Sequence, residues 1–163
     1  MLNGPAGVGK STAASLLTSW TDASAWVRGD DLKDFVVSKP TGGTASRVTY
    51  RNGAAVCAEL ISSGFSFVVF DFVFNDAESV ATFRSNLRTR EPFVFSLVTL
   101  WASETVLRER RKGRVDEPRY VDLMDRSRGL MEGNLDELGI VIDVETLDAK
   151  EVADKLAQLV ART

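Results

Sequence analysis

The residues with the clearest chemical meaning stand near the start of the chain. The stretch from Gly4 to Ser11 fits the pattern Gly, any four residues, Gly, Lys, Ser/Thr, which is typical of a phosphate-binding loop. Its glycines let backbone N–H groups turn toward a polyphosphate. Lys10 would contact the β- and γ-phosphates, and the Ser11 hydroxyl would bind Mg²⁺. The predicted nucleotide-binding residues are Gly4, Pro5, Ala6, Gly7, Val8, Gly9, Lys10, Ser11 and Thr12.

The flanking residues favour this interpretation over a glycine-rich turn that binds nothing. Apolar Met1 and Leu2 precede the loop, and a helical pattern over 11–20 follows it. The amino end of that helix would direct its partial positive charge at the phosphates.

Two adjacent carboxylates, Asp30 and Asp31, follow a predicted strand at 25–28. Ligands of open α/β sheets bind beyond the carboxyl ends of the strands, so these residues are expected near the phosphates. Asp30 is the candidate base for an acceptor hydroxyl, because the chain contains no histidine. Asp31 would also contact the acceptor; alternatively, one of the pair caps the next helix.

Asp71 follows the wholly apolar run 67–70, a pattern that predicts a strand buried on both faces. A charge this close to the core needs a strong partner. Asp71 therefore resembles a Walker B acid that holds Mg²⁺ through Ser11 or a water molecule. The alternative is a carboxylate that caps a loop amide.

A basic run over 108–114 is interrupted by a glycine and followed by a proline. Such a run is usually a solvated helix face. The break also suits a short arginine-rich lid, at about residues 108–118, that closes over ATP. Arg111 and Arg114 are the predicted catalytic arginines of that lid.

Four aromatic residues lie beside the predicted acidic positions: Trp26, Phe35, Phe72 and Phe74. They could wall an apolar acceptor pocket, although most aromatic residues in a chain of this kind belong to the core. Arg51 is either a surface charge or a further acceptor contact.

Strands alternate with helices throughout, which predicts one three-layer α/β domain over 1–163 with a parallel sheet. The strands are predicted at 1–3, 25–28, 67–71, 93–100 and 140–143. The helices are predicted at 11–20, 32–38, 46–63, 76–88, 104–112, 119–135 and 148–161.

The first strand is unusually short for one that feeds a phosphate-binding loop. Such a strand normally lies in the middle of the sheet, and three residues would leave neighbouring backbone groups unpaired. Either the neighbouring strands are short too, or the natural chain begins upstream of Met1.

Composition limits the partners. The 163 residues are 44% hydrophobic and carry a net charge of −3, so there is no basic field for nucleic acid or an acidic membrane. Cys57 is the only cysteine and no signal sequence precedes the loop, so the expected compartment is the cytoplasm. A small-molecule partner is expected, with the protein a monomer or homodimer.

Taken together, these segments resemble the P-loop kinases of small molecules, most closely chloramphenicol phosphotransferase and the tunicamycin-resistance type. The resemblance covers nearly the whole chain and rests on short motifs at 2–11, 29–32, 68–74, 111–115 and 142–146. Gluconate kinase is similar in the second and fourth of these.

The resemblance implies a five-stranded sheet of order 2-3-1-4-5, ATP and Mg²⁺ as cosubstrates, Asp30 as the base and Arg111 and Arg114 in the lid. The chain departs from the antibiotic kinases over 39–55, where the acceptor would be read. The leading hypothesis is transfer of the ATP γ-phosphate to a hydroxyl of a neutral or cationic antibiotic or metabolite. The alternatives are a nucleoside or nucleotide kinase, and a nucleotide-binding regulatory switch.

Overall fold

The strands form one parallel sheet of order β2-β3-β1-β4-β5, as the resemblance implied. The structure is a computed structural model that describes residues 1–38, 45–112 and 118–161, without the side chains of Arg111 and of residues 118–124. The strands are β1 (Leu2–Asn3), β2 (Ser24–Arg28), β3 (Phe67–Asp71), β4 (Val98–Trp101) and β5 (Ile140–Asp143).

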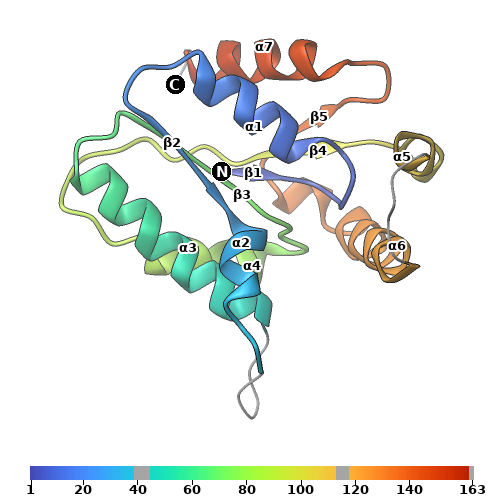
Figure 1. The fold of residues 1–163 in the computed structure, drawn as a ribbon, viewed down its shortest axis with the longest axis horizontal. Helices are drawn as coiled ribbons and strands as arrows, with labels where there is room; N and C mark the ends of the chain where they lie inside the picture. Colours follow the sequence, from blue (N-terminus) through green and yellow to red (C-terminus); the bar gives the residue numbers. More distant parts are fainter. Residues whose placement is uncertain (39–44, 113–117, 162–163) are drawn as a thin grey trace.

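Helices cover both faces of the sheet (Figure 1). On one face α1 (Lys10–Ser19) packs beside α7 (Ala149–Val160), and on the other α3 (Ala45–Ser62) packs beside α4 (Ala77–Asn86). The remaining helices are α2 (Gly29–Asp34), α5 (Glu104–Arg111), α6 (Pro118–Glu132) and a 3₁₀ turn at Leu135–Glu137. None of the helices within the described ranges is both long and apolar enough to cross a bilayer.

The helices α4, α5 and α7 start at their predicted caps, whereas α2 starts at Gly29 and ends at Asp34 instead of spanning the predicted 32–38. The Asp76 and Asp148 side chains each accept a hydrogen bond from the backbone N–H three residues on, in capping boxes with Ser79 and Glu151. The Ser103 hydroxyl caps α5 in the same way. These side chains satisfy backbone donors that have no partner inside the helix, which is why the predicted and observed starts agree.

One predicted strand is shorter than expected. The run 93–100 was predicted to be a strand throughout, but β4 begins only at Val98. Val98 pairs with Leu2, the first residue of β1, and with Ile140, the first residue of β5. The run before Val98 therefore has no strand beside it to complete a ladder.

The strands next to β1 are not matched to its length. β3 pairs with β2 over five residues but with β1 only at Asp71, and β4 pairs with β1 at Val98 and Thr99. One explanation for the short first strand was that its neighbours are short too. That explanation does not apply to β3.

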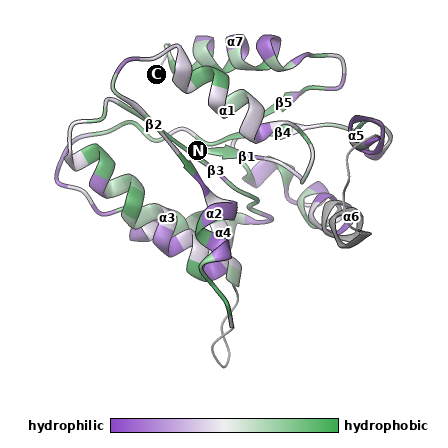
Figure 2. Cartoon of the chain, in the orientation of Figure 1, coloured by the Kyte–Doolittle hydropathy of each residue, from purple (hydrophilic) through white to green (hydrophobic). Residues whose placement is uncertain are grey.

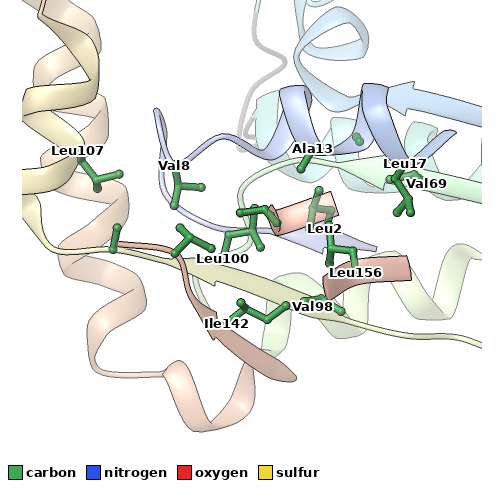
Figure 3. Packing of buried hydrophobic residues seen from close by; sticks show 14 residues of the cluster. Leu2, Val8, Ala13, Leu17, Val69, Val98, Leu100, Leu107, Ile142 and Leu156 are labelled. Atoms are coloured by element: carbon green, nitrogen blue, oxygen red, sulfur yellow. The ribbon is translucent and has the colours of Figure 1, made fainter. Parts of the chain in front are cut away.

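The core has two halves, separated by the sheet. On the side of α1 and α7, the strand residues Leu2, Val69 and Leu100 pack in one cluster with Leu156 of α7, as Figure 3 shows. The next residue, Phe70, faces α3 and α4 in an aromatic cluster with Phe72, Phe74, Phe83 and Tyr50. This alternation is the two-residue period of a strand covered on both sides. Figure 2 shows that α5, by contrast, is strongly hydrophilic.

The close approach of α3 to β3 generates a prediction at Gly53. A Cβ there would lie 2.4 and 2.5 Å from atoms of the buried Phe70 ring. We expect Gly53→Ala to lower the free energy of unfolding by about 1–3 kcal/mol because of this overlap, despite the better helix propensity of alanine. Urea denaturation measures the change.

Gly129 of α6 is the matched control, because a Cβ there would meet no heavy atom within 4 Å. Gly129→Ala should be neutral or should stabilise the protein by up to about 1 kcal/mol. A shift of both variants in the same direction would contradict the packing argument.

Candidate functional site

The predicted phosphate-binding loop connects β1 to α1 and is held by close packing. Gly4 has φ +143°, and a Cβ there would lie 2.5 Å from the Leu100 carbonyl oxygen, so a side chain cannot be accommodated. Val8 is buried in the core cluster that contains Leu100 and Leu107, as Figure 3 shows. Gly9 has φ +105° at the start of α1. The burial of Val8 therefore fixes the loop to the core, and the glycines permit its backbone conformation.

The Lys10 side chain folds back over this loop. Its Nζ donates hydrogen bonds to the carbonyl oxygens of Gly4 (2.8 Å) and Pro5 (3.0 Å). Burial lowers the pKa of Lys10 to about 8, although the charges of Asp71 and Asp30 oppose that shift. The ammonium group is thus positioned by the loop itself, within electrostatic range of both carboxylates.

Asp71 joins the tip of β3 to the start of α1. Its side chain accepts hydrogen bonds from the Ser11 hydroxyl (2.7 Å) and the Trp26 indole N–H (3.0 Å). The residue is only 5% exposed, so these two bonds satisfy a carboxylate that water barely reaches. Trp26 therefore orients the Asp71 carboxylate. Contact between Trp26 and an acceptor in the predicted pocket stays a prediction.

The oxygen atoms at this point suit Mg²⁺. The Ser11 hydroxyl and the Asp71 carboxylate are hard oxygen donors on adjoining elements, as the cation requires. Among the residues that the structure describes, no group of three or more His, Cys, Asp or Glu side chains could hold a metal alone. The arrangement thus fits an ion that also takes ligands from phosphate groups and water.

The two neighbouring carboxylates of α2 have different environments. Asp30 is exposed and acts electrostatically on Lys10. Asp31 forms an ion pair with Arg28 (3.4 Å), and neither residue caps α2, whose N-cap is Arg28 without a side-chain bond. The capping alternative is therefore wrong for this pair. Asp30 remains the candidate base, and Asp31 remains a predicted acceptor contact.

The aromatic residues separate into exposed and buried ones. Phe35, at the end of α2, is 76% exposed. Phe74 is fully buried and stacks on Tyr50, with ring centroids 4.7 Å apart. The prediction that Phe74 contacts the acceptor is therefore wrong, because the segment that follows β3 enters the core cluster and leaves no part of Phe74 exposed. Phe72 is buried in the same cluster. Arg51 is exposed on α3, where acceptor contact stays a prediction.

Arg110 is a residue that the sequence reasoning missed within the basic run. Its guanidinium donates hydrogen bonds to the carbonyl oxygens of Val8 (3.3 Å), Val144 (2.5 Å) and Leu147 (3.1 Å). It thereby connects the phosphate-binding loop to the β5–α7 connection. The only available signal was its spacing, three residues after the buried Leu107 of α5.

The two arginines chosen from the sequence are not described at the side-chain level. Arg111 ends α5, with its side chain outside the described part, and Arg114 lies outside the described residues altogether. The lid at 108–118 stays a prediction.

Asn3 is a second missed residue. It is fully buried, donates to the Phe74 carbonyl and the Thr99 hydroxyl (3.1 Å each), and accepts from the Phe74 N–H (2.8 Å). Thr99 donates in turn to the Leu138 carbonyl (2.6 Å). This network fixes β1 beside its neighbours just before the loop begins. A polar residue in a central strand was the signal.

Fold and site together define a P-loop protein with the five-stranded sheet of the P-loop kinases. An AAA domain family matches residues 1–137, and the chain belongs to that family. A search of curated protein sequences found no match.

Several solved structures share the fold. The tunicamycin resistance protein of Deinococcus radiodurans is 17% identical, with a TM-score of 0.70 over 98% of this chain and 92% of that one. A sugar kinase from a Janibacter species is 16% identical, with a TM-score of 0.69 and the same coverage. A gluconokinase from Sinorhizobium meliloti is 20% identical, with a TM-score of 0.63 over 99% and 90% of the two chains.

The environment of Lys10 predicts how affinity for ATP depends on pH. A bound polyphosphate favours the charged amine and so raises its pKa above the value of about 8 in the free protein. Below pH 8 the amine is charged in both states, and its titration leaves the affinity unchanged. Above pH 8 binding requires proton uptake, so affinity should fall by up to about tenfold per pH unit. Calorimetric titration with ATP between about pH 7 and 9.5 measures this.

Lys10→Arg provides the control, because an arginine stays charged over the whole range. Its affinity should be lower than that of the wild type but nearly independent of pH. An equal fall in both proteins would show that a group other than Lys10 titrates.

Proposed function

We propose that this protein is an ATP- and Mg²⁺-dependent phosphotransferase that transfers the γ-phosphoryl group to a hydroxyl of a small neutral or cationic molecule. The observation that carries the proposal is the convergence of Lys10, the Ser11–Asp71 pair and Asp30 at the carboxyl edge of the sheet. These are the parts that phosphoryl transfer needs: a phosphate cradle, metal ligands and a carboxylate for the nucleophile.

Each group has a distinct role in this reaction. The loop N–H groups and Lys10 hold the β- and γ-phosphates and stabilise the charge that shifts toward the leaving oxygen. Asp30 accepts the proton of the acceptor hydroxyl while the oxygen of that hydroxyl forms a bond to the γ-phosphorus. The bond between that phosphorus and the β,γ-bridging oxygen breaks, which releases ADP. The predicted lid arginines would neutralise the transferred group.

Ser11 and Asp71 are the residues that would hold Mg²⁺, which when bound neutralises phosphate charge and fixes the geometry of the phosphates. The hydrogen bond from Trp26 keeps the Asp71 carboxylate turned toward Ser11. ATP chemistry and a single cysteine fit an enzyme of the cytoplasm.

The acceptor side carries negative charge and exposed apolar surface. Asp30 and Asp31 would repel an anionic acceptor, whereas Phe35 offers an exposed ring for an apolar part of the substrate. Proteins with this fold are named for tunicamycin resistance and for sugar and gluconate phosphorylation. A first panel of acceptors should therefore contain nucleoside antibiotics, aminoglycosides and neutral sugars, with gluconate and nucleoside monophosphates as anionic comparisons.

The assigned roles predict different effects of two substitutions. Lys10→Ala should weaken ATP binding at least tenfold, because it removes charge-assisted contacts to phosphate. Asp30→Asn should leave ATP affinity within about threefold but lower the transfer rate by roughly 10²–10⁴-fold, as expected for loss of a general base. Calorimetry and a coupled ADP assay separate the two quantities.

Asp154→Asn serves as the matched carboxylate control, because Asp154 pairs with Lys150 on α7. It should retain both affinity and turnover. If the Asp30 and Lys10 variants lost ATP affinity equally, Asp30 would belong to the nucleotide site and the assignment would fail.

The same panel discriminates the other two hypotheses. Turnover stimulated mainly by nucleosides or their monophosphates would identify a nucleoside or nucleotide kinase. Slow ATP hydrolysis that no hydroxyl compound stimulates would favour the regulatory switch and would contradict the proposed transferase.

A further inference from the structure

A cavity lies at the opposite end of β1 from the phosphate-binding loop. It has a volume of about 800 Å³ and runs through the sheet layer between β3 and the segment before β4. One wall comes from Phe67–Phe70 and the other from Phe93–Ser96. Helices of both faces close it, with Leu156 on the α7 side and Cys57 on the α3 side.

The backbone pairing of β1 points into this cavity. The Met1 amine donates to the Ser96 carbonyl (2.6 Å), and the Val98 N–H donates to the Met1 carbonyl (3.0 Å). This alternation is the hydrogen-bond pattern of a parallel ladder, and it continues to the first nitrogen of the chain. The ladder thus stops where the cavity begins.

The register shows which residues an added strand would meet. Leu2 is opposite Asp71 and Val98. Two residues earlier, a residue joined to Met1 would lie opposite Val69 and Ser96, and the one before it opposite Val68 and Phe95. The first would face the cluster of Leu2 and the second the cluster of Cys57. From Val69 back to Ser66 the cavity spans about four residues, or roughly 13 Å of strand.

The cavity is poorly suited to the charged amine that now ends the ladder. Burial lowers the pKa of the Met1 amine to about 6. A peptide bond at that nitrogen would remove the charge and keep one N–H to donate to Ser96.

We propose that this cavity is a binding site for an extended apolar segment of about four residues, joined to the Met1 nitrogen, that continues β1 between β3 and Phe93–Ser96. β-Branched residues suit the site, because their side chains would alternate between two apolar walls. The segment would supply the first three residues of β3, Phe67 to Val69, with the partner that they lack in β1.

Cys57 is a built-in reporter for this proposal, because it lines the cavity and is the only cysteine of the chain. Three proteins are compared: the chain as given, a chain extended by Val-Ile-Val-Ile before Met1, and one extended by Gly-Ser-Gly-Ser. The rate of Cys57 alkylation by N-ethylmaleimide and the melting temperature are measured for each.

The apolar extension should slow alkylation at least tenfold and raise the melting temperature by roughly 5 °C or more, whereas the polar extension should change neither. A two-residue Val-Ile extension, which has less apolar surface to misassemble, should give intermediate values. The proposal is overturned if both extensions act alike, or if both apolar chains fail to fold while the polar one folds. If free Val-Ile-Val-Ile peptide slowed Cys57 alkylation of the unextended chain as much as the apolar extension does, the proposal would also be overturned, because the site would then be a peptide-docking groove.

Discussion

The hydrogen bond between Ser11 and Asp71 is the interaction on which the site depends. A carboxylate this deeply buried is stable only with good partners, and its two partners come from α1 and β2. The bond therefore joins three elements at one point on the carboxyl edge of the sheet. Ser11 directly follows Lys10 in the chain. The same contact therefore also fixes the position of Lys10 relative to the phosphate-binding loop.

Behind this point, close packing makes the sheet edge rigid. A Cβ at Gly29 would lie 2.5 Å from the Phe72 ring, just as one at Gly53 would meet Phe70. The backbone at the start of α2 and the helix α3 thus rest directly on the aromatic cluster. Rigid packing of this kind holds Asp30 at the start of α2, where a general base requires a defined position relative to the phosphates.

The phosphate-binding loop is supported mainly through side chains, because β1 contributes only two residues to the sheet. Asn3 compensates by bonding to Phe74, which follows β3, and to Thr99 of β4, and Arg110 compensates by bonding to Val8 of the loop. Both are polar groups that satisfy backbone carbonyls in places where water has little access. The cavity below Met1 marks the part of the sheet that these contacts do not support.

Local patterns in the sequence were sufficient for the phosphate-binding loop, the alternation of strands and helices and the capped helix starts, because each depends on residues near one another in the chain. Tertiary structure decided the rest. Phe74 and Phe35 are both aromatic residues beside predicted acidic positions, yet one is fully buried and the other is 76% exposed. Arg110 reaches Val8 because the fold brings α5 beside the phosphate-binding loop, 102 positions away in the chain. The run before Val98 is not a strand because its partner would have to come from β1. Burial, helix position and strand pairing depend on contacts between residues far apart in the chain, such as Tyr50 with Phe74 and Leu2 with Val98, which no local pattern specifies.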